Sequence, residues 1–310
     1  MRNYYIKRIL SAILTLFIIA TVTFFMMKLM PGGPFARERP IQPEIIELLE
    51  EKYNLNDPIF VQYYKYMLGI IKFDFGYSYR ELGVNVTEQI LLKFPISLRL
   101  GLYATIAIIV LGIPIGIVSA LRENTWVDHL AMFLATIGVT IPSFVVAVVY
   151  ISLVAGQLGW VDAFGLDEWT SYIGPVLALA AYSLSFVSRL TRSSMLEVLR
   201  QDYMRTARAN GLPKVKVLYK HALKNALIPV VTYIGPMFAS IITGSFVVER
   251  VFSIGGIGKY YVESVSNRDY TMIMAVTVFY AAIYIFMVFL VDIAYSWIDP
   301  RIKLGKTSGE

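Results

Sequence analysis

The side chains of this sequence that are best placed for ionic contacts gather in one segment, from Arg189 to Lys224. This segment holds nine Lys or Arg residues, and only Glu197 and Asp202 carry the opposite charge. Its central run, RTARANG, ends at Gly211, so small residues stand among the guanidinium groups. Guanidinium groups pair with carboxylates, and small side chains let another surface approach closely. The residues alone allow two interpretations: a docking surface for a protein partner, or a basic loop that binds anionic lipid.

Residues that could catalyse a reaction or hold a metal ion are scarce elsewhere. The chain has no cysteine and two histidines, His129 and His221, and neither histidine has carboxylates around it at metal-ligand spacing. Gly305, Lys306 and Thr307 resemble the end of a phosphate-binding loop, but Pro300 stands where that loop requires its first glycine. We therefore predict no catalytic, cofactor-binding or metal-binding residue in this chain, and we expect that it is not an enzyme.

The elements that must position the basic segment are membrane spans. Apolar residues make up 57% of the chain and charged residues 16%, which is typical of a membrane protein. Six stretches lack charge over about the 20 residues that a helix needs to cross a bilayer. They are Ile9–Met27, Leu100–Leu121, Leu130–Val161, Trp169–Ser188, Asn225–Val248 and Tyr270–Val291. Because each backbone amide in lipid needs an internal partner and no alternating strand pattern is present, we predict an all-α protein with six transmembrane helices.

The orientation follows from the distribution of Lys and Arg, which are retained on the cytoplasmic side. With both termini in the cytoplasm, sixteen of the 28 basic residues lie in cytoplasmic segments. These are Arg2, Lys7, Arg8, Arg122, the nine of the basic segment, Arg301, Lys303 and Lys306. We therefore expect both termini inside.

The part between the first two spans is expected outside. Pro43 begins an acidic amphipathic stretch, EIIELLEEKYNL, and residues 58–72 carry Phe60, Tyr64 and Ile71 at helical spacing. We predict two helices here, and we interpret the second as a helix at the membrane interface rather than a ligand site.

The middles of the spans contain no charged residue. Arg99, Arg189, Arg192 and Asp292 stand at span ends, where snorkelling or an interfacial ion pair explains them. This argues against an ion-coupled carrier, which needs charge at mid-membrane. Prolines lie in or near several spans, at positions 114, 142, 175, 229 and 236, and we expect kinks there.

Inside the basic segment, residues from Ser193 to Arg205 are spaced as one continuous helix that leaves the membrane and ends before Gly211. Ala207 and Ala209 would leave a thin surface for a partner.

The order of residues in the segment resembles the ATPase-coupling loop of binding-protein-dependent ABC importers. That pattern is Glu-Ala-Ala, three residues, Gly, nine residues, Ile-x-Leu-Pro. Ala207, Gly211 and Leu223 match it, while Arg205, Thr206, His221 and Lys224 depart from it. The departures resemble the peptide and nickel branch, whose members carry DYxRTARAxG and HALxNALxPV, here beginning at Asp202 and His221. The resemblance assigns the coupling role to Asp202, Arg205, Thr206, Ala207, Arg208, Ala209, Gly211, His221 and Leu223.

Further motifs extend the resemblance to the membrane subunits of oligopeptide permeases over nearly the whole chain. They are MPGGPF at Met30, FDFGYSY at Phe73, SRLTRSSMLEVL at Ser188, TGSFVVERVFSIGGIG at Thr243, SNRDYTM at Ser266 and IDPRIK at Ile298. The resemblance implies the type I ABC importer permease fold in a bacterial cell membrane. We expect four parts: a cytoplasmic N-terminus with the first transmembrane helix (1–30), an extracytoplasmic segment (31–97), a five-helix permease core (98–296) with the cytoplasmic coupling loop 189–224, and a cytoplasmic tail (297–310).

The resemblance also implies the function and the partners. The chain would be one membrane subunit of an ATP-driven oligopeptide importer that works by alternating access. Its partners would be a second homologous permease subunit, two cytoplasmic ATPases that bind ATP and Mg²⁺, an external peptide-binding lipoprotein, the peptide and the bilayer, but no nucleic acid. A dipeptide or nickel importer is the alternative, and an ion-coupled carrier a more distant one. The sequence identifies no residue of the substrate path.

Overall fold

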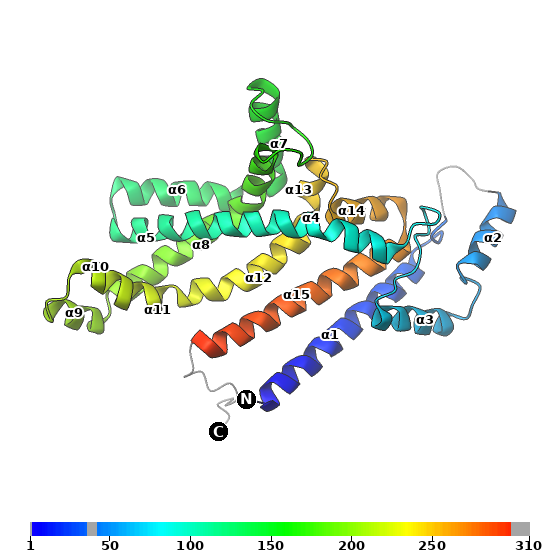
Figure 1. The fold of residues 1–310 in the computed structure, drawn as a ribbon, viewed down its shortest axis with the longest axis horizontal. Coiled ribbons are helices and arrows are strands. Elements are labelled where there is room, and N and C mark those ends of the chain that lie inside the picture. Colours follow the sequence, from blue (N-terminus) through cyan, green and yellow to red (C-terminus); the bar gives the residue numbers. More distant parts are fainter. Residues whose placement is uncertain (1, 36–41, 299–310) are drawn as a thin grey trace. The chain divides into compact units, whose positions relative to one another are not determined.

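The computed structural model describes residues 2–35 and 42–298, and this part of the chain is helical (Figure 1). One isolated bridge, between Tyr77 and Asn85, is the only extended pairing found there. The α-helices are α1 (Arg2–Leu29), α2 (Pro43–Lys52), α3 (Ile59–Lys72), α4 (Val86–Ala107), α5 (Ile113–Leu121), α6 (Trp126–Thr140), α7 (Ser143–Tyr150), α8 (Ile173–Leu199), α9 (Asp202–Ala209), α10 (Lys214–Lys216), α11 (Lys224–Ala226), α12 (Ile228–Gly244), α13 (Phe246–Val251), α14 (Ile257–Asn267) and α15 (Tyr270–Ile298). Short π or 3₁₀ turns are η1 (Ile108–Gly112), η2 (Ile151–Gln157), η3 (Thr170–Tyr172) and η4 (Val217–Leu223). The all-α prediction is confirmed, and the helices predicted from Pro43 and over residues 58–72 are α2 and α3. The phosphate-loop-like residues from Gly305 lie outside the described residues.

Five helical segments are long and apolar enough to cross a membrane. They are Ile6–Leu29, Val86–Leu121, Thr170–Leu199, Ile228–Val251 and Tyr270–Ile293. The second begins well before the predicted Leu100. The prediction missed these first turns because they carry Glu88, Lys93 and Arg99, and it searched for uncharged runs. A sixth span exists if the bent pair α6 and α7–η2 is counted as one.

The third predicted span is not a single rod. The helices Trp126–Thr140 and Ser143–Gln157 meet at an angle of 102°, and Figure 1 shows α7 turned away from the line of α6. Ile141 has an extended backbone (ψ 124°), and Pro142 follows it with ψ 144°. A residue before proline is disfavoured in the helical region, which explains why the predicted kink here is a complete break.

The chain divides into two compact units. One contains residues up to Ser97 together with Gly255–Phe286, and the other contains Leu98–Ile254 with the described residues from Met287 on.

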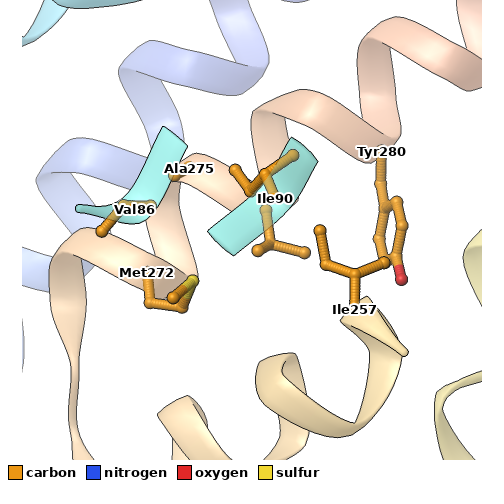
Figure 2. Packing of buried hydrophobic residues seen from close by; sticks show 7 residues of the cluster. Val86, Ile90, Ile257, Met272, Ala275 and Tyr280 are labelled. Carbon is orange, nitrogen blue, oxygen red and sulfur yellow. The ribbon is translucent and has the colours of Figure 1, made fainter. Parts of the chain in front are cut away.

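The core of the first unit is formed by α4, α14 and α15. Figure 2 shows Val86 and Ile90 of α4 with Ile257 of α14, and with Met272 and Tyr280 of α15. Ser97 Oγ accepts a hydrogen bond from the Ile257 backbone amide at 3.0 Å, so α4 also caps the start of α14.

A second cluster of the first unit joins α3, in the segment between the first two spans, to α1 and α15. Phe24 of α1 stacks on Tyr66 of α3, with ring centroids 5.4 Å apart, and lies edge-on to Tyr63 at the same distance. Tyr270, Ile273 and Met274 of α15 complete this cluster. The inner face of amphipathic α3 is therefore aromatic and packed, while Phe60 and Tyr64 are exposed.

The second unit is built around α8, against which α5 and α6 pack (Figure 1). Glycines allow this close approach: a Cβ on Gly116 would lie 2.5 Å from the Ser188 carbonyl oxygen, and one on Gly138 would lie 2.1 Å from Ser185 Oγ. Any larger residue would push these helices apart.

Candidate functional site: the basic segment between α8 and α12

The basic segment leaves α8 through a sharp break rather than as a continuation. α8 ends at Leu199, Gln201 has an extended backbone (φ −69°, ψ 150°), and α9 begins at Asp202. The prediction of one continuous helix from Ser193 to Arg205 is therefore wrong. The break turns the apolar side of α9 back onto its own bundle, where burial of Met204 outweighs the local tendency to continue the helix.

The inner face of α9 is packed against neighbouring helices of the second unit. Met204 and Ala207, three residues apart, are 0% and 6% exposed. They belong to a cluster with Met195 of α8, Ala120 of α5 and Val217 of η4. Ala207 thus holds α9 against this chain, and the expectation that it forms part of an open contact surface is corrected.

The outer face of α9 is open and mainly basic. Five of the predicted coupling residues are exposed on α9: Asp202, Arg205, Thr206, Arg208 and Ala209. The Arg205 guanidinium lies 3.4 Å from the Asp202 carboxylate, but both side chains are more than three-quarters exposed. Such a solvated pair is worth little, so both charges remain available for other contacts.

Gly211 ends this element as predicted. It has φ +71°, and its amide donates to the Arg208 carbonyl at 3.0 Å. This left-handed conformation is easy for glycine and costly for a residue with a Cβ. Nothing lies within 4 Å of where that Cβ would be, so the requirement for glycine is conformational and not steric.

The return to the membrane runs through α10, the π-helical turn η4 and α11. His221 and Leu223 are partly buried here, on either side of the buried Ala222. Asn225 Nδ2 donates to Tyr203 Oη at 3.0 Å and so ties α11 to α9. Of the nine predicted coupling residues, the structure places five on the open face of α9 and Gly211 at its exposed end; Ala207, His221 and Leu223 belong to the packed side.

A buried ion pair that the sequence did not predict joins α8, which leads into the basic segment, to α6. Arg192 of α8 donates through Nε and Nη2 to the two oxygens of Asp128 of α6, at 2.6 and 2.7 Å. Asp128 is 1% exposed, and it also accepts from Ser119 Oγ at 2.5 Å and from the Asn124 amide at 2.9 Å. The sequence suggested an interfacial pair for Arg192 but named no partner. The one signal in the sequence was that a guanidinium at the end of a span needs a carboxylate partner.

A second, exposed ion pair links the same elements. Arg200 Nη2 lies 2.7 Å from Glu123 Oε1, which joins the break between α8 and α9 to the turn between α5 and α6. α9 itself contacts α5, α8, η4 and α11 of the same unit, and the break before it is tied to the turn between α5 and α6.

The described residues contain no group of three or more His, Asp or Glu side chains that could hold a metal ion. His129 is exposed on α6.

Similarity to known proteins extends over nearly the whole chain. Residues 112–304 match the family described as binding-protein-dependent transport system inner membrane component, and residues 1–101 match the N-terminal region of the membrane components of such systems. The dipeptide transport system permease protein DppB of Bacillus subtilis is 47% identical, with 99% of each chain covered. The oligopeptide transport system permease protein OppB of Salmonella typhimurium is 41% identical, over 98% of this chain and all of the relative.

Solved structures agree on the fold. A chain of the inward-facing MetNI methionine ABC transporter superposes with a TM-score of 0.54 at 16% identity, over 68% of this chain and 96% of that one. A chain of an amino acid ABC transporter gives 0.51 at 18% identity, over 70% and 95%. The type I importer permease fold that the motifs implied is thus confirmed, and the chain belongs to the family of inner-membrane components of binding-protein-dependent transport systems.

Proposed function

We propose that this chain is one membrane subunit of an ATP-driven peptide importer of the bacterial cell membrane. The observation that carries the proposal is similarity along the full length to permeases named for dipeptide and oligopeptide transport, at 47% and 41% identity. The chain forms half of the translocation path, and a homologous permease subunit forms the other half. A peptide-binding lipoprotein delivers the substrate from outside.

Energy enters from two cytoplasmic ATPase subunits, which bind ATP and Mg²⁺ and which contact the open face of α9. The arrangement of α9 supports this role: Arg205 and Arg208 project outward, while Met204 and Ala207 fix the helix to its own bundle. A displacement of α9 is therefore transmitted directly to α8. The hydrogen bond between Asn225 and Tyr203 transmits it to α11 and so to α12. The ATPases shift the permease between inward- and outward-open states only if they hold α9 differently in their open and closed forms.

Both termini and the basic segment lie in the cytoplasm in this proposal, and α2 and α3 lie outside. The positive charge of the basic segment supports that orientation.

Oligopeptides are the proposed substrate, and dipeptides or nickel are the alternatives. Among the alternatives, dipeptides have more support than nickel, because a relative named for dipeptide transport is 47% identical.

The test is uptake of a labelled tetrapeptide, a labelled dipeptide and Ni²⁺ by cells that lack this chain, with and without its restoration. We expect restoration to recover peptide uptake but not Ni²⁺ uptake. Arg208→Glu should abolish the recovery and the co-purification of ATPase subunits, whereas Arg122→Glu, an exposed reversal in the turn between α5 and α6, should leave both intact. Normal peptide uptake without the chain would refute the function, and normal co-purification with Arg208→Glu would refute the assigned surface.

A further inference from the structure

A half-enclosed cavity lies in the first unit, beside the outer end of α1. Its volume is about 370 Å³, and its walls include the aromatic rings of Phe24, Tyr66 and Tyr79. Lys28 of α1, Glu50 of α2 and Tyr270 of α15 also line it. The cavity therefore combines aromatic walls with two positive side chains, Lys28 and Lys65, and one negative side chain, Glu50.

The charge of Lys28 is fixed in place. Its amine donates to Gln62 Oε1, and it lies 5.8 Å from the centre of the Phe24 ring. Gln62 is held in turn, because its Nε2 donates to the carbonyls of Leu55 and Asp57 at 2.8 and 2.7 Å. Among the described residues no carboxylate pairs with Lys28, whereas Lys65 in the same cavity pairs with Asp57 at 2.6 Å. An ordered ammonium without a counter-ion, in a cavity, favours an anionic group as occupant.

Three buried hydroxyl groups in the cavity wall have no hydrogen-bond partner among the described residues: those of Tyr66, Tyr270 and Thr271. Tyr270 is only 4% exposed. Leaving a buried hydroxyl unsatisfied costs about 1–3 kcal/mol, so each calls for a partner from outside the chain. A tyrosine hydroxyl is protonated at neutral pH and can donate, and burial raises the pKa of Tyr66 further above its ordinary value.

The position of the cavity along α1 narrows the choice of anion. Lys28 stands in the last turn of the apolar segment Ile6–Leu29, at the level where phospholipid headgroups lie. Val22 and Met26, in the turns before it, are 50% and 58% exposed and offer an apolar surface for acyl chains. A lipid whose headgroup lies at this level can pack its acyl chains along the apolar surface of α1. A water-soluble anion has no acyl chains and would leave that surface unused.

We propose that this cavity binds the headgroup of a zwitterionic phospholipid, with the phosphate against Lys28 and the two tyrosine hydroxyls, and the headgroup amine against Glu50. Lys28 and Glu50 match the two charges of an ethanolamine headgroup. The lipid belongs to the outer leaflet in the orientation proposed above, but its binding does not depend on transport.

The test is native mass spectrometry of the full-length chain in mild detergent, titrated with dioleoylphosphatidylethanolamine or dioleoylphosphatidylglycerol. We expect one tightly held phosphatidylethanolamine, with Lys28→Met weakening its binding about tenfold and Tyr270→Phe about threefold, as the loss of one charged and one neutral hydrogen bond implies. Tyr270→Phe removes a hydroxyl that has no internal partner, so the lipid-free protein should keep its melting temperature. Glu50→Gln should abolish the preference for ethanolamine over glycerol.

Matched controls are Lys72→Gln and Glu51→Gln, which change charges on α3 and α2 outside the cavity lining. Both should bind lipid as the unchanged chain does. Equal binding by the Lys28→Met chain, or absence of any retained lipid, would overturn the proposal. So would displacement of the lipid by dialanine, which would assign the cavity to peptide, or by inorganic phosphate, which would assign it to the free anion.

Discussion

Ala207 and Ala209 are two residues of one short helix with opposite environments. Ala207 is 6% exposed in the cluster with Met195, and Ala209 is exposed. We expect Ala207→Leu to destabilise the purified chain by about 1–3 kcal/mol through overpacking, whereas Ala209→Leu leaves its stability unchanged and weakens only the proposed ATPase contact. Thermal unfolding of the chain alone, beside ATPase co-purification, separates the two effects. Equal unfolding temperatures for both variants would contradict the packing of α9.

The pair of Asp128 and Arg192 makes a prediction that depends on its burial. Arg192→Met leaves the Asp128 carboxylate buried without its cation, which costs about 3–5 kcal/mol. Asp128→Asn together with Arg192→Met removes both charges, and we expect this double variant to be more stable than Arg192→Met alone. The stability of Arg192→Lys should lie between those of the unchanged chain and Arg192→Met, because an ammonium cannot reproduce the bidentate contact of Nε and Nη2. Unfolding in a denaturing detergent compares these three variants, and a double variant no more stable than Arg192→Met alone would refute the coupling.

At the scale of elements, the sequence predicted which helices exist and whether they are apolar or amphipathic better than it predicted where one helix ends and the next begins. Uncharged runs located the spans, and the amphipathic patterns located α2 and α3, because burial in lipid or against one face acts on many residues at once. The break at Arg200 and Gln201 was missed because it depends on the packing of Met204 against residues distant in sequence. The exposed coupling residues were found from a motif, but motif spacing does not reveal which of them face inward, as Ala207 does.

The approach of α5 to α8 gives a prediction about element packing. We expect Gly116→Ala to destabilise the second unit, since the added carbon would lie 2.5 Å from the Ser188 carbonyl oxygen and 2.6 Å from Thr191 Cβ. Gly244→Ala, in α12, is the control: its added carbon meets nothing within 4 Å, so the change should be neutral or slightly stabilising. Heat-induced aggregation of the detergent-solubilised variants provides the measurement. A Gly116→Ala chain as stable as the control would contradict the close contact.

At the scale of the whole molecule, the bent pair α6 and α7–η2 decides the topology. If it crosses the membrane as one span, three crossings separate α2 from α9, and the two lie on opposite sides. If it turns back instead, only two crossings separate them, and they share a side. The chain has no cysteine, so single cysteines can be introduced without background. Exposed positions before, between and after these crossings are Glu51, Trp160 and Ala209.

We expect a membrane-impermeant maleimide to label Glu51→Cys and Trp160→Cys from outside, and Ala209→Cys only in inverted vesicles. That pattern requires α6 and α7–η2 to act as one crossing despite their 102° bend, and it places the basic face of α9 where cytoplasmic ATPases can reach it. Labelling of Glu51→Cys and Ala209→Cys from one side, with Trp160→Cys on the other, would instead identify a re-entrant pair. It would also place the basic segment on the same side as α2, against the cytoplasmic location that its positive charge predicts. The position of Trp160 thus connects a single proline break to the orientation of the entire permease.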